Sequence, residues 1–439
     1  MLCSSSAAAS TAAPWTCAVR ACWRITSTKR RFAQVTRGWT VNRQRALTDG
    51  AVEINAGVLA KPSLLGGVCN GSEPLWALRA KGAHIWDQQE RCYLDLMMGF
   101  GSVILGHADP VVTDAVIEDI RGGISPTLRK VKEQDLAELL ASVVPNAEMV
   151  MFLKTGSDAT SAAVRVARAY TGRSVVLRWG YQGWHDWCAP RGSGIPTVYR
   201  DLTENLPFND IESLRKAFAQ NKGEVAAVIV MVADSEVLDR EYLLEVRRLA
   251  DLHGSLFILD EVRTGFRLAL GGAQEYFNID ADLVAISKAM ANGHPMAALT
   301  GRREVMRTVA DVSMSSVFFR STDGISAAIA TVQSLQSTDA ISVVWERGRQ
   351  LQEGMIDGAA KAGLPVHVIG LPPMPFHRFE LTGTSLVRAL DVFYETTWKE
   401  GLLLHRDHHW FTCAAMSVAD IERAISIIGM GYQAVANAL

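Results

Sequence analysis

Residues 255–288 read SLFILDEVRTGFRLALGGAQEYFNIDADLVAISK and contain two short apolar runs, each ending near a charged residue, Asp260 or Lys288. Apolar runs of this length, separated by helix-length sequence, are typical of buried parallel strands. Sheets of this kind bind their ligands at the carboxyl ends of the strands. The pattern therefore predicts an α/β fold in which Asp260 and Lys288 lie at one edge of the sheet.

A buried aspartate that faces a lysine at such an edge suits the chemistry of pyridoxal 5'-phosphate (PLP). Lys288 would form a Schiff base with the cofactor, and Asp260 would keep the pyridinium nitrogen protonated, so that the ring accepts electrons. The same pattern also fits an ordinary strand-end aspartate and a solvated lysine, because strand ends commonly carry polar residues. The choice between these interpretations depends on the rest of the chain.

The segments LFILDEVRTGFR (256–267) and ADLVAISKAMANGHPMAALTGR (281–302) resemble the core of the class III, fold-type I, PLP-dependent aminotransferases, in particular the branch that includes glutamate-1-semialdehyde aminomutase. The likeness extends over roughly residues 50–439. It implies a large PLP-binding domain with a mostly parallel central sheet, a smaller α+β domain built from both ends of the chain, and a homodimer. The boundaries expected from it are 49–95 and 336–439 for the small domain and 96–335 for the large one.

The segment EMVMFLKTGSDATSAAVRVARAY (148–170) reads as a strand, a Gly-Ser turn and an amphipathic helix. Backbone amides at a helix N-terminus bind phosphate, so Gly156 and Ser157 are expected to hold the cofactor's phosphate. Taken alone, Ser157 would more commonly be a plain N-cap. The downstream Asp260 and Lys288 favour the phosphate site.

Three further residues complete the predicted cofactor site. Tyr181 can stack on a planar pyridine ring, and Val262, on the same strand face as Asp260, would press on the opposite side of that ring. The resemblance also implies a threonine that reaches the cofactor phosphate of the neighbouring subunit. Val317 occupies that position here, so the nearby hydroxyls of Ser315, Ser316 and Thr322 are the candidate substitutes, and Ser316 is the one we assign.

The chain departs from the family pattern at several positions. Gln182 replaces a histidine, and Met231 and Val232 replace a Glu-Pro pair, with Asp234 as a candidate replacement for the lost acid. Aminomutases carry a Ser-Pro-Val-Arg stretch whose arginine binds the substrate carboxylate, but residues 66–76 contain no arginine, and the next one is Arg79. An aminotransferase with separate donor and acceptor is therefore favoured over glutamate-1-semialdehyde aminomutase. A catalytically impaired binding protein with this fold is a third reading, which the retained Lys288 and Asp260 oppose.

Composition excludes several other classes of protein. A formal net charge of -2 and the lack of a basic stripe in the body of the chain argue against nucleic-acid binding. The seven cysteines have no metal-ligand spacing, and no apolar run approaches the ~20 residues that a membrane span needs. The histidines at 405, 408 and 409 and the pair His185 and Asp186 are interpreted as structural, so no metal site is expected.

The first 48 residues contain no Asp or Glu and are basic, with arginines and lysines set among Ser, Thr and Ala. This composition is typical of a transit peptide, which would place the protein in the matrix of a plastid or mitochondrion. A start codon assigned upstream of the true one would give the same leader, and the protein would then be cytoplasmic.

Two short motifs near the start of the family-like region predict local structure. Residues 75–95 form two alternating runs around a polar turn at 87–90, which indicates a hairpin. Asp109 followed by Pro110 predicts the N-cap and first position of a helix.

Overall fold

The computed structural model describes residues 76–189, 192–233 and 236–439. All of the described residues belong to one compact unit, Pro62–Leu439. The predicted leader (1–48), residues 66–75 of the segment without arginine, and Asp234 lie outside the described residues. Within the described part, no helix is long and apolar enough to cross a membrane.

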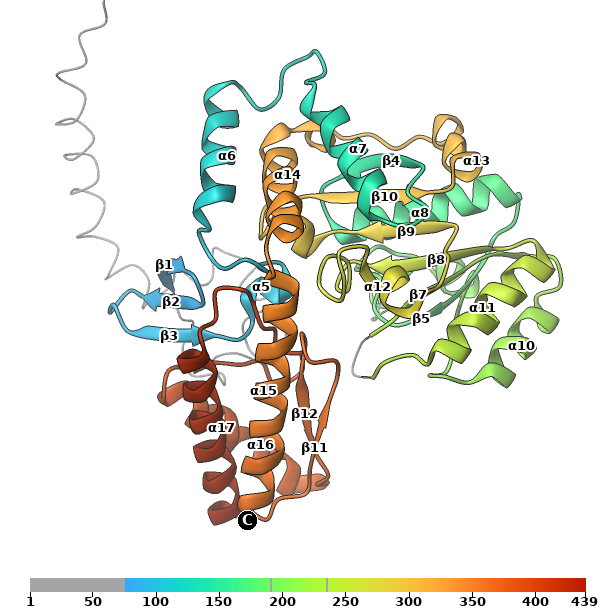
Figure 1. The fold of residues 1–439 in the computed structure, drawn as a ribbon. Helices are drawn as coiled ribbons and strands as arrows, with labels where there is room; N and C mark the ends of the chain where they lie inside the picture. The colour runs from blue at the N-terminus through green and yellow to red at the C-terminus, as the bar shows by residue number, and fades with distance from the viewer. Residues whose placement is uncertain (1–75, 190–191, 234–235) are drawn as a thin grey trace, which may run out of the picture. The chain divides into compact units, whose positions relative to one another are not determined.

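The centre of the described unit is a seven-stranded sheet (Figure 1). Its strands are, in spatial order, β4 (Met149–Leu153), β10 (Ala297–Gly301), β9 (Leu283–Ile286), β8 (Leu256–Glu261), β7 (Val225–Met231), β5 (Val175–Trp179) and β6 (Thr203–Asn205). The five strands from β9 to β6 are parallel, whereas β10 runs antiparallel to both β9 and β4. The predicted α/β fold with a mostly parallel sheet is therefore confirmed.

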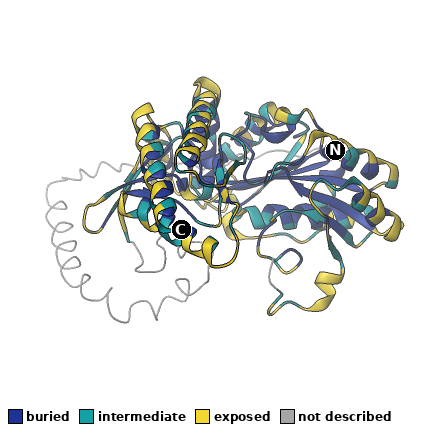
Figure 2. Cartoon of the chain, turned by 90° about the horizontal axis from the view of Figure 1, so that it is seen from below, coloured by how far each residue is buried: buried dark blue, intermediate teal, exposed yellow. Residues whose placement is uncertain are grey.

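Alternate residues of the central strands pack into two separate hydrophobic cores. Ile229 and Ile258 belong to the core that contains helix α8 (Gly156–Thr171), while Val230 and Leu259 belong to the core that contains α11 (Arg240–His253). Strands covered on both faces need side chains that are apolar in both directions, which explains the unbroken apolar runs of the sequence. Figure 2 shows these strands in dark blue, with exposed yellow surface on the helices.

The helices differ widely in length. The longer ones of the sheet-containing part are α6 (Pro110–Arg121), α7 (Lys132–Val143), α8, α10 (Ile211–Gln220), α11 and α14 (Thr322–Ser337). The short ones are α5 (Met98–Gly101), α9 (Thr197–Asp201), α12 (Gly272–Phe277), α13 (Arg303–Met306), and the 3-10 helices η1 (Lys288–Ala291), η2 (Arg307–Asp311) and η3 (Val317–Arg320). Helix α6 begins as predicted, because the Asp109 carboxylate accepts hydrogen bonds from the amides of Val111 and Val112, both at 3.1 Å, and Pro110 occupies the first turn.

A second sheet joins the two ends of the described chain. It contains β1 (Ala77–Lys81), β2 (His84–Asp87), β3 (Cys92–Asp95) and β13 (Leu402–Leu403), and β13 pairs in parallel with β3. The hairpin prediction was incomplete, because the segment forms three antiparallel strands rather than two. The missed turn lies at Gly82, whose φ of +58° is a backbone conformation that glycine adopts without steric cost.

The C-terminal part consists of three long helices and a two-stranded sheet. Its elements are α15 (Ala340–Lys361), β11 (Val366–Ile369), β12 (Phe376–Phe379), α16 (Gly383–Lys399) and α17 (Val418–Ala438). The exact domain boundaries at 95 and 335 stay predictions.

Arg267 connects distant segments of the fold through backbone hydrogen bonds. Its guanidinium is fully buried and donates to the carbonyl oxygens of Gly101 at 2.9 Å, Thr412 at 2.9 Å and Pro373 at 3.3 Å. It also lies 5.0 Å from the centre of the Phe411 ring. Burial lowers the pKa of Arg267 to about 10, so the group still carries its charge at neutral pH. This side chain therefore fixes the segment before the C-terminal helix against the sheet-containing part.

We predict that Arg267→Met destabilises the protein by several kcal/mol, because each buried carbonyl that loses its donor costs about 1–3 kcal/mol. Urea unfolding measures the loss. The control is Arg79→Met, because Arg79 is exposed on β1 and stacks on Trp86, a contact worth roughly 0.5–1 kcal/mol. Equal stability of the two variants would contradict the structural role of Arg267.

Candidate active site

The carboxyl ends of β7 and β8 and the segment after β9 border a cavity of about 240 Å³. Six of the seven predicted site residues line it: Gly156, Ser157, Tyr181, Asp260, Val262 and Lys288. These residues come from four separate segments of the chain. The topology thus brings together side chains that the sequence could only assign one by one.

Asp260 sits at the carboxyl end of β8, opposite Met231 of β7 in the strand register. Its side chain is 1% exposed, and Oδ1 accepts a hydrogen bond from the Val262 amide at 3.0 Å. Burial raises the pKa of Asp260 to about 7, while the Val262 amide and the charges of Lys288 and Arg263 act in the opposite direction. A carboxylate in this position is stabilised by a cation such as a protonated ring nitrogen.

Lys288 is the first residue of η1 and lies two positions beyond the end of β9. Its φ of +49° is uncommon for a residue other than glycine and turns the chain at the sheet edge. The preceding Ser287 fixes this turn, because its hydroxyl donates to the Met296 carbonyl at 2.8 Å. Lys288 is partly buried in the cavity wall, and its charge acts on the pKa of Asp260.

The start of α8 corrects one interpretation of Ser157. The N-cap is Thr155, whose hydroxyl accepts from the Asp158 amide at 3.1 Å, while the Asp158 carboxylate accepts from the Thr155 amide at 2.9 Å. This reciprocal capping box makes Ser157 the second helical residue and not the cap. Its position in the first turn is compatible with an anion at the positive end of a helix that has 16 residues.

Two glycines allow the chain to approach closely around this helix start. A Cβ on Gly156 would lie 2.6 Å from a methyl group of Val262, and a Cβ on Gly183 would lie 2.3 Å from the Ser157 hydroxyl. Either substitution would force the cavity wall apart. Because Gly156 and Gly183 have no side chain, Val262 and Ser157 can pack directly against the backbone at these two positions.

Tyr181 and Val262 enter the cavity wall from different segments. Tyr181 is 50% exposed, and burial of the remainder, followed by the Cys188 thiol and the Asp260 carboxyl, raises its pKa. Both residues line the cavity, as the predicted contacts with a flat ring require. That they cover opposite faces of the ring stays a prediction.

Two residues that depart from the family pattern, Met231 and Gln182, line the same cavity as Asp260. Met231 is buried and lines the cavity, so an apolar thioether is the β7 neighbour of Asp260. Gln182 is also buried, donates to the Trp179 carbonyl at 2.6 Å and accepts from Arg178 at 3.2 Å. Gln182 therefore fixes the loop that carries Tyr181.

Ser316 is the one predicted site residue that the structure does not bring to this cavity. It caps η3, where its hydroxyl accepts from the Phe318 amide at 3.3 Å. Of the other two candidates, Ser315 lines a different hollow beside His185, and the Thr322 hydroxyl donates to the buried carboxylate of Asp119. A contribution of Ser316 to a neighbouring subunit's site stays a prediction.

The histidines flagged in the sequence have structural contacts. His185 Nδ1 lies 2.7 Å from the Ser161 hydroxyl, which also accepts from Trp187 at 2.8 Å. Burial, with the Arg263 charge second, lowers the pKa of His408 to about 2, so this imidazole is neutral. Among the described residues, no group of three His, Cys, Asp or Glu side chains is arranged to hold a metal ion.

Arg263 is a cavity residue that the sequence reasoning missed. The resemblance directs attention to positions 66–79 for a basic residue, because the family's arginine-containing motif falls there. The available signal was the run Asp260-Glu261-Val262-Arg263, which places an arginine immediately after the predicted ring contact.

Comparison with known proteins identifies the family. The model of the aminotransferase class-III family matches residues 69–185 and 179–371. The chain belongs to the class III aminotransferases. It is therefore an enzyme of PLP-dependent amino-group transfer, and Asp260, Lys288 and the start of α8 offer a carboxylate, an amine and a helix N-terminus that fit this cofactor.

Relatives within the family differ in their reactions. The chain is 36% identical to 3-aminobutyryl-CoA aminotransferase of Cloacimonas acidaminovorans (82% of this chain, 89% of the relative) and 33% identical to 2'-deamino-2'-hydroxyneamine transaminase of Streptomyces kanamyceticus (77% and 88%). It is 30% identical to glutamate-1-semialdehyde 2,1-aminomutase of Aquifex aeolicus (82% and 92%). The fold matches the FumI protein of Sphingopyxis sp. MTA144, solved in its PLP internal aldimine form, with a TM-score of 0.85 at 28% identity, covering 90% of this chain and 97% of that one.

We predict that Asp260→Asn stabilises the cofactor-free protein at pH 8 and that the gain shrinks toward pH 5. Folding raises the pKa of the Asp260 carboxyl from 3.8 to about 7. Between these pH values the folded protein binds more protons than the unfolded protein, so the free energy of unfolding of the wild type falls as pH rises. The difference between variant and wild type should change by up to about 1.4 kcal/mol per pH unit. Thermal unfolding at several pH values measures it.

The matched control is Asp282→Asn, because Asp282 is equally buried but accepts from the Phe257 amide at 2.7 Å and pairs with Arg247 at 2.9 Å. This variant should be less stable than wild type at pH 8. If Asp260→Asn also destabilised the cofactor-free protein at pH 8, Asp260 would already be balanced by partners of the protein itself.

Proposed function

We propose that the chain is an aminotransferase that moves an amino group between two separate substrates, with PLP held by Lys288 and Asp260. The observation that carries this proposal is the meeting of a buried carboxyl with a raised pKa and a lysine in one cavity at the edge of a parallel sheet. When bound, PLP supplies an electron sink for the bond-breaking step at the amine-bearing carbon.

The residues of the chain have separate roles in this proposal. The Lys288 amine binds the cofactor covalently between turnovers and carries the proton to and from the amine-bearing carbon of the substrate. The Asp260 carboxylate accepts a hydrogen bond from the protonated ring nitrogen and holds that proton in place. Tyr181 and Val262 orient the ring, and the first turn of α8, with Gly156 and Ser157, binds the phosphate.

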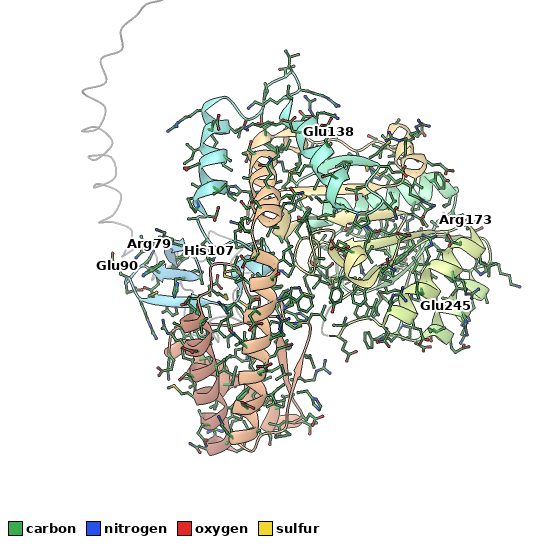
Figure 3. The ribbon with its side chains drawn as sticks, viewed as in Figure 1. Arg79, Glu90, His107, Glu138, Arg173 and Glu245 are labelled. Carbon is green, nitrogen blue, oxygen red and sulfur yellow. The ribbon has the colours of Figure 1, made fainter. Side chains whose placement is uncertain are left out.

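One observation favours an aminotransferase over an aminomutase. Arg79, the first arginine after the segment that lacks the carboxylate-binding residue, is exposed on β1 and lies 3.6 Å from the centre of the Trp86 ring (Figure 3). Sequence identity does not separate the two reactions, because relatives named as aminotransferases match at 36% and 33% and relatives named as glutamate-1-semialdehyde 2,1-aminomutases at 30–35%.

We predict that amines and amino acids convert the bound cofactor to its amine form and that glutamate 1-semialdehyde turns over poorly. A missing guanidinium partner for a desolvated carboxylate costs roughly 2–5 kcal/mol, which is about 30-fold to several thousandfold in rate or affinity. The half-reaction is followed by the change in cofactor absorbance with each substrate. Conversion of the semialdehyde to 5-aminolevulinate at a typical enzyme rate would contradict this proposal and assign the chain as an aminomutase.

We also propose that the protein is a homodimer, as the family resemblance implies. Large apolar side chains that a subunit interface would cover are exposed: Leu128 is 80% exposed, Val131 77%, Val317 75% and Phe318 63%. Such a grouping of apolar residues on a surface is typical of an interaction site.

We predict that protein lacking residues 1–48 has the mass of a dimer in light scattering, and that Phe318→Glu shifts it toward monomer because a charge cannot be buried at an apolar interface. Ile356→Glu, on the exposed side of α15, is the matched control and should leave the mass unchanged. A wild-type monomer with full activity would contradict the proposed assembly.

A further inference from the structure

We propose that a second cavity, separate from the cofactor cavity, binds the phosphate group of a small-molecule ligand. Its volume is about 270 Å³, and its walls come from the ends of β5 and β6, the segment after β5 and helix α9. No described residue lines both cavities. The inference goes beyond the proposed function, because none of the reacting groups takes part in it.

The strand register brings three polar side chains to one wall of this cavity. Arg178 of β5 is the register partner of Asn205 of β6, and Thr203 lies two residues before Asn205. Residues two apart on a strand point to the same face of the sheet. All three residues line the cavity, and Arg178 Nε donates to Asn205 Oδ1 at 2.7 Å.

Two guanidinium groups line the cavity without an acidic partner. Arg200, in the last turn of α9, packs over Gly192, where a Cβ would lie 2.9 Å from Nη1. Within the described part of the chain, neither Arg178 nor Arg200 forms an ion pair, and the Arg200 side chain makes no hydrogen bond. Burial lowers the pKa of Arg178, as expected for a cation that has lost water and gained no carboxylate.

The acidic groups of the cavity do not cancel this charge. Burial raises the pKa of the Cys188 thiol to about 12, so this group is neutral at physiological pH. Among the described lining residues the acid is Asp186, which is exposed and pairs with neither arginine. Two guanidinium groups and one carboxylate leave the lining with a net positive charge, which favours an anionic ligand.

A buried hydroxyl also lacks a partner at this place. Thr203 Oγ1 is buried and has no hydrogen-bond partner among the described residues. Buried polar atoms of native proteins are nearly always paired, so this atom indicates a water, an ion or a ligand that completes the site.

The arrangement of donors favours phosphate over carboxylate. Hydrogen-bond donors come from β5, β6 and α9, at Arg178, Thr203, Asn205 and Arg200. A phosphate group presents three strong acceptor oxygens in different directions, whereas a carboxylate presents two in one plane. The volume lies just below the roughly 300–1,000 Å³ of ordinary ligand pockets, so an organic group can accompany the phosphate.

One hydrogen bond connects the two cavities and decides where to mutate. Arg178 Nη1 donates to the side chain of Gln182, which lines the cofactor cavity, at 3.2 Å. A substitution of Arg178 would therefore disturb both cavities. Arg200 and Thr203 have no such connection and are the residues to change.

The test is calorimetric titration of holoenzyme with glycerol 3-phosphate in a buffer without phosphate. Borohydride reduction first fixes the cofactor, so that the start of α8 is already occupied. We expect one ligand per chain, and affinity about tenfold or more weaker in Arg200→Met and in Thr203→Val, because hydrogen bonds to a charged group are strong. Arg121→Met is the matched control and should bind as wild type, because Arg121 is also an exposed helical arginine but lies on α6, outside the cavity lining.

Thermal unfolding checks the Thr203→Val variant independently of the ligand. Valine keeps the shape of threonine and removes a hydroxyl that has no partner, so Tm should equal or exceed that of wild type. A lower Tm would show that the hydroxyl is already used within the protein and would overturn its assignment to a ligand.

Inorganic phosphate and acetate identify the chemistry of the ligand. Weaker binding of inorganic phosphate than of glycerol 3-phosphate would assign an organic phosphate, and equal binding would assign free phosphate. Tighter binding of acetate, no binding of either phosphate to wild type, or equal affinity in Arg200→Met and Arg121→Met would overturn the proposal. Because the titration measures binding and not turnover, its failure would leave the proposed amino-group transfer unaffected.

Discussion

The site depends on the cost of burying a carboxylate at the end of β8. Asp260 lies between an apolar β7 neighbour, Met231, and the all-buried strand β9, and this environment raises its pKa to about 7. The folded protein therefore retains an unfavourable group that the ring nitrogen of the cofactor can neutralise. In the proposed function, Asp260 would both help to bind PLP and keep its ring nitrogen protonated, so that one interaction would supply binding energy and the electron sink.

The parallel sheet explains why so few residues are needed to build this site. Parallel strands end at a common edge, so residues that follow β7, β8 and β9 converge although they are far apart in sequence. Helix α8 points its first turn at the same cavity, and close packing at Gly156 and Gly183 brings Val262 and Ser157 into the wall. The C-terminal segment contributes His409, which contacts Arg263. Different parts of the chain thus support the wall of one cavity.

The sequence was sufficient for features that depend on local pattern. Two apolar runs identified β8 and β9, and the charged residues after them led to the cavity. Asp109 and Pro110 predicted the start of α6, since a cap is a local interaction. Features that depend on long-range packing were harder to predict. The convergence of Gly156, Tyr181 and Lys288 on one cavity is such a feature, because it depends on how three separate segments pack.

Other misses have the same physical origin. Arg263 was overlooked because a strand-end arginine reads as solvated until the tertiary fold buries it. Gly82 divides one predicted run into two strands, because a residue with positive φ ends the extended backbone.

The most direct test of the account is the identity of the lysine that binds PLP. Lys154 is a chemically reasonable rival, because burial lowers its pKa, but its amine donates to the Ser321 carbonyl at 3.0 Å and lies 3.8 Å from Asp323. Borohydride reduction of the holoenzyme, digestion and mass spectrometry locate the attached cofactor. The account predicts a reduced phosphopyridoxyl group on Lys288, whereas modification of Lys154 or of any other lysine in its place would contradict it.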